Sequence, residues 1–275
     1  MAYANYELNG QNHVGEVHGD HLIPLTGLTE IGPDTPTDVL NSAERRHAER
    51  VPVTGVRLRA VSPNAGKIIC IGLNYKAHIE ESNRELPTYP VMFPKYASSL
   101  ISPNADIVLP PESSQVDYEG ELAVIIGKVG RRISEENAPD HILGYTVCND
   151  VTMRDYQYKT HQWMQGKAWD NSTPLGPYLI TPDEVDLTSA AISTTLNGEV
   201  VQKSDLSYLI FSIPTLIATV SEFTELQPGD VILTGTPSGV GYRRDPQLFL
   251  HDGDVVTVEI EGVGTITNKV TAEQI

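Results

Sequence analysis

The sequence has little cysteine, few aromatic residues and no long hydrophobic run. It holds two cysteines among 275 residues, Cys70 and Cys148, which excludes a disulfide-rich fold and a cysteine-based zinc site. Each lies in an apolar stretch, so we expect buried thiols in a reducing, cytoplasmic compartment. The longest apolar stretch, 209–220, is interrupted by polar residues and falls short of the ~20 residues of a membrane helix. We therefore expect neither a membrane span nor a signal peptide.

Positive charge is also scarce. The chain has 19 lysines and arginines against 36 aspartates and glutamates, a formal net charge of −17. Such a chain repels phosphate backbones and anionic lipid surfaces, so we expect no nucleic-acid partner and no membrane partner. A small anionic ligand would need a local positive site, and a divalent cation is one way to create it.

Several familiar catalytic motifs are missing. The three Gly-Lys pairs are followed by Ile, Val and Ala, so there is no Walker A loop. The stretch 238–241 (SGVG) lacks the third glycine of a dinucleotide-binding fingerprint, and neither GxSxG nor HExxH occurs. Nucleotide binding, a serine-hydrolase elbow and a zincin site are therefore not indicated.

The pattern of the chain predicts a mixed α+β fold that is mainly β. Residues 1–62 are expected to form a small N-terminal α/β appendage, and residues 63–275 a catalytic domain. The second region contains many short β-branched runs and one amphipathic helix, 213–223, with Ser212 as its cap. Asn197-Gly198 predicts a tight hairpin turn. Many strands and few helices favour a barrel or roll over a doubly wound sheet.

One predicted strand, 116–127 (VDYEGELAVIIG), carries acidic residues at alternate positions. Asp117, Glu119 and Glu121 therefore share a face, where their charges repel one another unless a cation or water compensates them. A hard ion such as Mg²⁺ or Mn²⁺ prefers carboxylate ligands of this kind. The alternative is an edge strand with a solvated acidic face.

Two further groups of polar residues follow. Asp150 stands at the end of the predicted strand 143–149, as either a functional side chain or the cap of the helix after it. In that helix Arg154 and Gln157 are three residues apart and share a face. Lys167 lies in a glycine-flanked loop, which is unusual for a merely solvated lysine, although a surface loop remains the alternative.

A histidine and a carboxylate also occur at helical spacing. His78 and Glu81 are three residues apart in a predicted helix, 74–86, with Asn74 as its cap. A carboxylate that orients an imidazole suits the activation of water, although surface pairs of this kind are common. The segment LTGTPSGVG presents backbone N–H groups and the Thr236 hydroxyl, which either hold a carboxylate or form a simple turn.

Taken together, these segments resemble the fumarylacetoacetate hydrolase family. The matching pieces follow one another in the family's order over residues 67–270: IGLNYKAHIEE, FPKYASSLI, VDYEGELAVIIG, GYTVCNDVTMRD, QGKAWDNSTPLGP, LNGEVVQ and PGDVILTGTPSGVG. The resemblance implies a fumarylacetoacetate hydrolase-like β-roll and a homodimer. It also implies one Mg²⁺ or Mn²⁺ held by Glu119, Glu121 and Asp150.

The same resemblance assigns roles to the remaining residues. Asp117 would support a metal ligand or Lys167, and Lys167 would lie near the metal. The oxo-acid end of the substrate would be held by Arg154, Gln157 and Thr236. His78 and Glu81 would form the lid's water-activating pair.

These roles predict enolate chemistry on a 2-oxo acid. The implied reaction is hydrolysis of a carbon–carbon bond in a 2,4-dioxo acid of the acylpyruvate type. Among the reactions considered, it alone requires an activated water, which is what His78 and Glu81 would provide. An oxaloacetate-type decarboxylase or an isomerase of a 2-oxo diacid at the same site is the alternative. A binding protein without turnover is a third possibility, against which the intact carboxylates and lysine argue.

Overall fold

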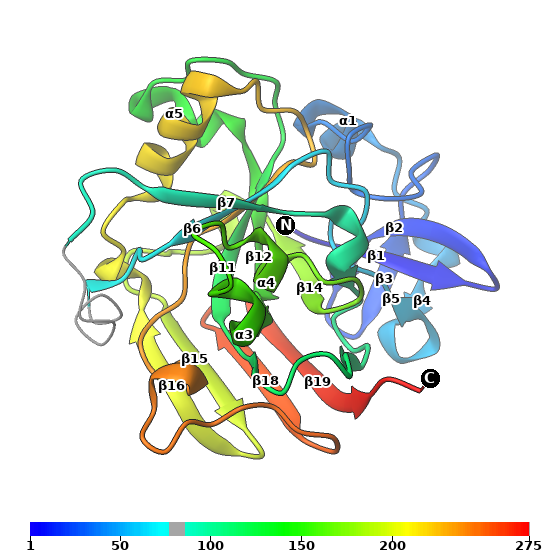
Figure 1. Cartoon of the computed structure of the whole chain (residues 1–275). Helices are drawn as coiled ribbons and strands as arrows, with labels where there is room; N and C mark the ends of the chain where they lie inside the picture. Colours follow the sequence, from blue (N-terminus) through cyan, green and yellow to red (C-terminus); the bar gives the residue numbers. More distant parts are fainter. Residues whose placement is uncertain (77–85, 275) are drawn as a thin grey trace.

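The protein is mainly β with few helices, as predicted. The computed structural model describes residues 1–76 and 86–274 (Figure 1). Within them the strands form three sheets, and the largest runs through the centre of the molecule.

The largest sheet has its strands in the order β4-β3-β2-β1-β14-β12-β11-β17-β6-β7, with β5 beside β1 and β8 beside β14. The bounds are β1 Ala2–Leu8, β2 Gln11–His18, β3 His21–Pro24, β4 Val51–Pro52, β5 Arg57–Leu58, β6 Ile68–Gly72, β7 Val91–Lys95, β8 Leu100–Ile101, β11 Gly120–Ile126, β12 Ile142–Asn149, β14 Thr173–Ile180 and β17 Val231–Leu233.

A five-stranded sheet packs below these strands in the view of Figure 1, and a two-stranded ladder completes the set. The five strands, in sheet order, are β16 Glu199–Asp205, β15 Ala191–Leu196, β18 Val255–Ile260, β19 Gly264–Ala272 and β9 Ile107–Leu109; the ladder pairs β10 Val116–Asp117 with β13 Thr152–Met153. The described α-helices are α1 Thr37–Ser42, α3 Arg154–Gln157, α4 Met164–Lys167 and α5 Ile213–Phe223. Short 3-10 helices are η1 His47–Glu49, η2 Val53–Gly55, η3 Ala97–Ser99, η4 Glu135–His141, η5 Pro182–Glu184, η6 Leu206–Tyr208 and η7 Gly241–Arg243.

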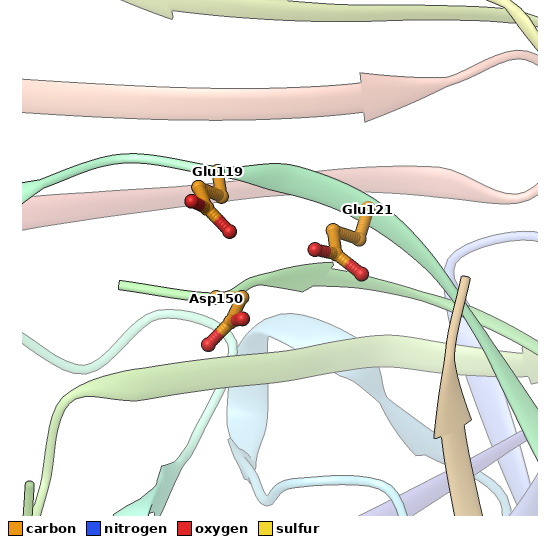
Figure 2. Close-up of side chains that lie close together, drawn as sticks. All are labelled: Glu119, Glu121 and Asp150. Atoms are coloured by element: carbon orange, nitrogen blue, oxygen red, sulfur yellow. The ribbon is translucent and has the colours of Figure 1, made fainter. Parts of the chain in front are cut away.

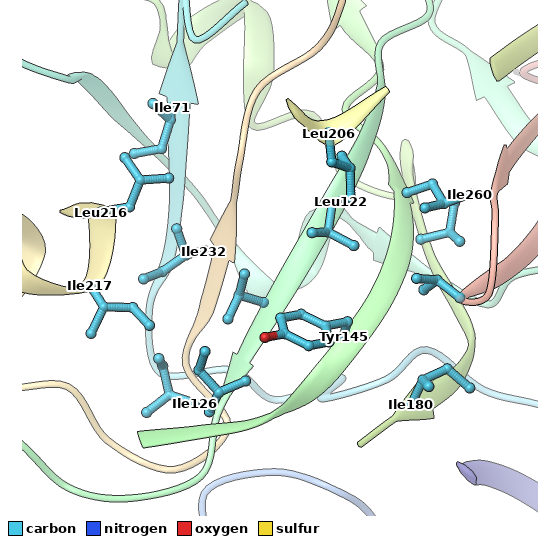
Figure 3. Packing of buried hydrophobic residues seen from close by; sticks show 14 of the residues in the cluster. Ile71, Leu122, Ile126, Tyr145, Ile180, Leu206, Leu216, Ile217, Ile232 and Ile260 are labelled. Carbon is cyan, nitrogen blue, oxygen red and sulfur yellow. The ribbon is translucent and has the colours of Figure 1, made fainter. Parts of the chain in front are cut away.

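The centre of the large sheet is the antiparallel pair β11 and β12, every residue of which is buried. The run LAVII explains this, because β-branched and aliphatic side chains suit a strand covered on both faces. Leu122, Val124 and Ile126 enter one core cluster, while Ala123 and Ile125 enter another on the opposite face. Figure 3 shows the first cluster, in which Ile126 lies near residues of β17 and α5.

The first 62 residues do not form a sheet of their own. β1 pairs with β14 through Ala2↔Ile180 and Tyr3↔Leu179, so the N-terminal strands extend the large sheet (Figure 1). The division at residue 62 remains a prediction, whereas the continuity of the sheet across it is a property of the structure.

Two local predictions are confirmed. The Ser212 side chain accepts a hydrogen bond from the Thr215 backbone N–H and so caps α5. Asn197 and Gly198 both have positive φ, 53° and 84°, at the turn between β15 and β16, as a type I′ turn requires. Among the residues that the structure describes, no helix is long and apolar enough to cross a membrane.

Candidate metal and oxo-acid site

Three acidic side chains meet where β11 begins and β12 ends. The two strands are antiparallel, with Gly120 opposite Asn149, so Glu119, Glu121 and Asp150 come to one place. One carboxylate oxygen of each lies within 4.8 Å of those of the other two (Figure 2). All three residues are at most 5% exposed, so the alternative of a solvated edge strand is wrong.

Asp150 is part of this cluster and caps no helix. Its carboxylate accepts hydrogen bonds from Lys95 Nζ at 2.7 Å and from Lys167 Nζ at 2.8 Å. The N-cap of α3 is Met153, whose side chain makes no capping hydrogen bond. The local pattern favoured a cap because it contains no information about the two lysines, which come from elsewhere in the sequence.

Lys167 lies between two of the acids. Its Nζ donates to Glu119 Oε2 at 2.6 Å as well as to Asp150, and the residue is 2% exposed, so the surface-loop alternative is wrong. It is the last residue of α4, which packs closely on α3. A Cβ on Gly166 would lie 2.4 Å from the backbone nitrogen of Gln157, so this close approach requires glycine.

Lys95 is a site residue that the sequence analysis missed. Its side chain is fully buried, and its Nζ bonds to Asp150, to the carbonyl of Val151 at 3.3 Å and to the carbonyl of Lys167. A signal was present, because Lys95 and Phe93 are two residues apart on β7 and share a buried face. A lysine on such a face requires a charged partner.

Asp117 supports the site through Arg154. Its Oδ2 accepts from Arg154 Nε at 2.8 Å, while Arg154 Nη1 lies 2.7 Å from Glu119 Oε1 and donates to Gln157 Oε1 at 3.0 Å. Asp117 is not in the three-acid cluster, because the chain leaves the strand between β10 and β11. Within the described part of the chain, Arg154 Nη2 is buried without a hydrogen-bond partner. The hydrogen bond between Arg154 and Gln157 confirms the prediction that their spacing brings them together.

The segment around Thr236 supports the third acid. The backbone N–H of Gly235 donates to Glu121 Oε2 at 2.7 Å, so this loop does hold a carboxylate, one of the protein itself. The Thr236 hydroxyl donates to the carbonyl of Gly120 at 3.0 Å and accepts from Gln202 Nε2 at 2.8 Å. Gln202, which the sequence analysis did not single out, thus braces both the loop and the start of β11.

The three carboxyl groups differ in their electrostatics. Burial opposes ionisation of Glu119, yet the charges of Lys167 and Arg154 outweigh it and lower its pKa. Burial likewise opposes ionisation of Asp150, where the charges of Lys167 and Lys95 lower the pKa. For Glu121, burial, then repulsion from Asp150 and Glu119, outweigh the charge of Lys167 and raise its pKa well above the ordinary value.

Lys167 and Arg154 stay charged at the site. Burial opposes the charge of Lys167, but Asp150 and Glu119 outweigh it and raise its pKa. Burial also opposes the charge of Arg154, whose pKa Asp117 and Glu119 raise. Both side chains are therefore permanent hydrogen-bond donors near neutral pH.

The donor set fits a divalent cation. Three carboxylates are the ligands that Mg²⁺ and Mn²⁺ prefer. Among the described residues, no lysine or arginine forms an ion pair with Glu121, so the site lacks positive charge at this carboxylate. A cation bound between the three acids would supply it.

A cleft opens onto these residues. Polar groups and a set of apolar and aromatic side chains share its wall. The lining residues are Ile71, Gly72, Leu73, Phe93, Glu119, Glu121, Arg154, Gln157, Tyr158, Trp163, Lys167, Thr236, Val240, Tyr242 and Arg243.

The predicted pair His78 and Glu81 lies outside the described residues, as does most of the predicted helix 74–86. Asn74, its expected cap, is described. The Asn74 side chain donates to the carbonyl of Thr234 at 2.8 Å and accepts from the backbone N–H of Phe211 at 2.7 Å. It therefore ties the end of β6 to the segments after β17 and before α5.

The sequence has close relatives of known name. Residues 67–271 match the family described as fumarylacetoacetate (FAA) hydrolase C-terminal. The chain is 42% identical over 266 residues to the mitochondrial oxaloacetate tautomerase FAHD2A of Homo sapiens, covering 92% of this chain and 85% of the relative. It is 47% identical over 220 residues to the mitochondrial oxaloacetate tautomerase fahd2 of Xenopus laevis, covering 79% and 69%.

The fold also matches solved structures along their whole length. A 5-carboxymethyl-2-hydroxymuconate delta-isomerase from Mycobacterium smegmatis superposes with a TM-score of 0.85 at 34% identity, covering 99% of this chain and 100% of that one. A 2-hydroxyhepta-2,4-diene-1,7-dioate isomerase from Mycobacterium marinum superposes with a TM-score of 0.83 at 32% identity, covering both chains completely.

Proposed function

The chain belongs to the fumarylacetoacetate hydrolase family, and from this premise we propose that it catalyses keto–enol tautomerisation of oxaloacetate with the help of a divalent metal ion. Relatives that cover most of the chain carry the name oxaloacetate tautomerase, and structural neighbours carry the names of isomerases. The observation that carries the proposal is the buried cluster of three carboxylates with Lys167 between two of them.

Mg²⁺ or Mn²⁺ would be held by Glu119, Glu121 and Asp150. When bound, the ion supplies Lewis acidity that stabilises negative charge on the C2 oxygen of a 2-oxo acid. The protein fixes the three carboxylates before the ion arrives, because Lys167, Lys95 and the Gly235 N–H already hold them.

Two cationic side chains are placed to act on the substrate. Arg154 would bind the C1 carboxylate through Nη2, which is buried and has no hydrogen-bond partner among the described residues. Lys167, held protonated by its two acids, would donate to the C2 oxygen as it becomes negatively charged. Gln157 and Thr236 line the same cleft and would complete the contacts with the oxo-acid end.

Tautomerisation moves one proton between C3 and the C2 oxygen and shifts the double bond between C2–O and C2–C3, and it breaks no bond between heavy atoms. The intermediate is the substrate's enolate, whose C2 oxygen the positively charged Lys167 side chain would stabilise. Hydrolysis of an acylpyruvate and decarboxylation of oxaloacetate pass through an enolate of the same kind. Hydrolysis additionally needs an activated water, for which the motif offers His78 and Glu81, so it is our second candidate.

The test follows three reactions of metal-stripped protein, each with and without added Mg²⁺. Decay of enol-oxaloacetate absorbance reports tautomerisation, pyruvate formed from oxaloacetate reports decarboxylation, and pyruvate formed from acetylpyruvate reports hydrolysis. We expect Mg²⁺-dependent tautomerisation to be the fastest, and Lys167→Met to slow it by about 10²–10³-fold, the usual effect of removing one preorganised oxyanion donor.

Other results would decide between the candidates. Faster pyruvate release from acetylpyruvate would favour the hydrolase, and release from oxaloacetate matching enol decay would favour the decarboxylase. Activity that persists unchanged after metal removal, or in Lys167→Met, contradicts the proposed site. A chain that binds Mg²⁺ but turns over none of these substrates would be a binding protein.

We also propose that the protein acts on a small molecule and forms a homodimer, as the family resemblance implies. We further propose that it is cytoplasmic, although curated relatives are named as mitochondrial. Light scattering coupled to size-exclusion chromatography would measure the first property. Fractionation of the source cells would measure the second.

A further inference from the structure

One arginine on the cleft wall has no role in the site described so far. Arg243 is half-buried and lines the same cleft as Glu119 and Lys167. Its guanidinium lies over the ring of its neighbour Tyr242, with 5.3 Å between Cζ and the ring centroid. Within residues 1–76 and 86–274, no carboxylate forms an ion pair with it, although the chain has an excess of acids.

The position of Arg243 is tied to that of Arg154. The backbone N–H groups of Gly241 and Tyr242, the first two residues of η7, donate to Asp117 at 2.8 and 2.9 Å. The same carboxylate accepts from Arg154 Nε at 2.8 Å. Asp117 therefore positions two arginines on a single cleft. Arg154 lies beside the proposed metal ligands, and Arg243 lies in η7, directly after Tyr242.

Aromatic side chains line the cleft together with Arg243. The Tyr242 ring packs against the Tyr158 ring, with 5.1 Å between their centroids, and both line the cleft. Trp163 lines the cleft as well. A guanidinium beside aromatic rings is weakly hydrated and binds a carboxylate through two parallel hydrogen bonds.

The charges of the site indicate what this arginine binds. When all four acids at the floor are ionised, as they would be around a bound cation, Asp117, Glu119, Glu121 and Asp150 exceed Lys95, Arg154 and Lys167 by one negative charge. A divalent cation turns this into one net positive charge. Arg243 adds a second, so a dianion neutralises the cleft and a monoanion does not.

We propose that Arg243 binds the second carboxylate of a dicarboxylic 2-oxo acid and so selects diacids over monoacids. This inference rests on the proposed function, because it assumes that the C1 carboxylate and C2 oxygen occupy the metal end of the cleft. Under this assignment Arg154 binds one end of the substrate and Arg243 the other.

The experiment compares oxaloacetate with pyruvate, which lacks only the second carboxylate. Wild type, Arg243→Gln, Arg243→Lys and the control Arg50→Gln are assayed with Mg²⁺. Arg50 is an exposed arginine of the N-terminal region, and its replacement removes the same charge from the chain.

In Arg243→Gln we expect the KM for oxaloacetate to rise about 10–100-fold, the range for a lost hydrogen bond between charged groups, with kcat changed less than about threefold. The inhibition constant of pyruvate should stay within about twofold, and Arg243→Lys should recover part of the loss. Arg50→Gln should match the wild type.

Two results of these assays would overturn the inference. An unchanged KM for oxaloacetate in Arg243→Gln refutes it while leaving the proposed function intact. An equal weakening of pyruvate and oxaloacetate places Arg243 at the shared oxo-acid end instead. If the wild type does not turn over oxaloacetate, the proposed function fails. Titration calorimetry in the presence of Mg²⁺ then tests the inference by itself. The inference requires that the wild type bind oxaloacetate more tightly than pyruvate, and that Arg243→Gln lose this preference.

Discussion

The two ends of the strand pair β11 and β12 are equally buried but opposite in chemistry. At one end Gly120 pairs with Asn149, and the three acids gather there (Figure 2), with two lysines bonded to them. At the other end Ile126 pairs with Ile142, and the neighbours are aliphatic (Figure 3). The same two strands therefore form the charged site at one end and part of the hydrophobic core at the other.

The aliphatic end stabilises the fold, because each Å² of apolar surface that it buries contributes roughly 25 cal/mol. The charged end does not have this effect. Desolvation of buried ion pairs offsets most of their attraction, so such clusters add little stability. The acids and lysines are therefore explained by a ligand of the site, and not by the stability of the chain alone.

The largest effect is expected for Glu121→Gln, which keeps the shape of the side chain and the bond from Gly235. It removes one metal ligand, so activity should fall at least about 1,000-fold, since metal catalysis is worth several kcal/mol. Without metal, the variant should be at least as stable as the wild type, because the buried carboxylate faces Asp150 and Glu119. Steady-state rates and chemical denaturation in chelator measure the two effects.

If Glu121→Gln were less stable than the wild type, the contrast between the two ends would not hold, because the Glu121 carboxyl group would then contribute to the stability of the fold. Retained activity would remove Glu121 from the proposed ligand set.

The next effect is expected for Lys95→Met, at the same charged end. Asp150 loses one of its two cations, and breaking a buried pair in this way typically lowers the free energy of unfolding by about 3–5 kcal/mol. Lys67→Met is the matched control, because the Lys67 side chain is 29% exposed where it pairs with Asp230. Urea unfolding in chelator compares them, and equal losses in the two variants would argue against a special role for Lys95.

At the aliphatic end, Ile126→Ala should lower the free energy of unfolding by about 2–4 kcal/mol, because it leaves a cavity among buried side chains. The kcat of the folded protein and its Mg²⁺ affinity should not change. Val129→Ala is the control, because Val129 is 49% exposed. A large fall in kcat for Ile126→Ala would show that the two ends are coupled.

The smallest effect is expected for Arg57→Gln, which removes an exposed ion pair with Glu7 in the N-terminal strands. Exposed pairs contribute less than about 1 kcal/mol, so the thermal midpoint should hardly move. A shift as large as that of Lys95→Met would mean that burial does not decide what an ion pair contributes.

The sequence predicted the aliphatic end of the strand pair well. The run LAVII identifies a strand buried on both faces, and the predicted cap at Ser212 and turn at Asn197-Gly198 are both confirmed. These features depend on neighbours within a few residues, which the local pattern contains.

The charged end was predicted less completely. Alternation placed Glu119 and Glu121 on one face but wrongly added Asp117, because it cannot detect the break before β11. Local pattern favoured a cap at Asp150, whose cluster membership came from family resemblance alone. Lys95 was missed because it meets Asp150 across 55 residues of chain, and its partner is set by strand pairing.

The most direct test of the central claim is calorimetric titration of Mg²⁺ into metal-stripped wild type and Glu121→Gln at one pH. The account predicts one saturable ion per chain in the wild type, a matching rise in its unfolding temperature, and neither effect in the variant. Equal binding by both proteins, or no binding by the wild type at millimolar Mg²⁺, would contradict it.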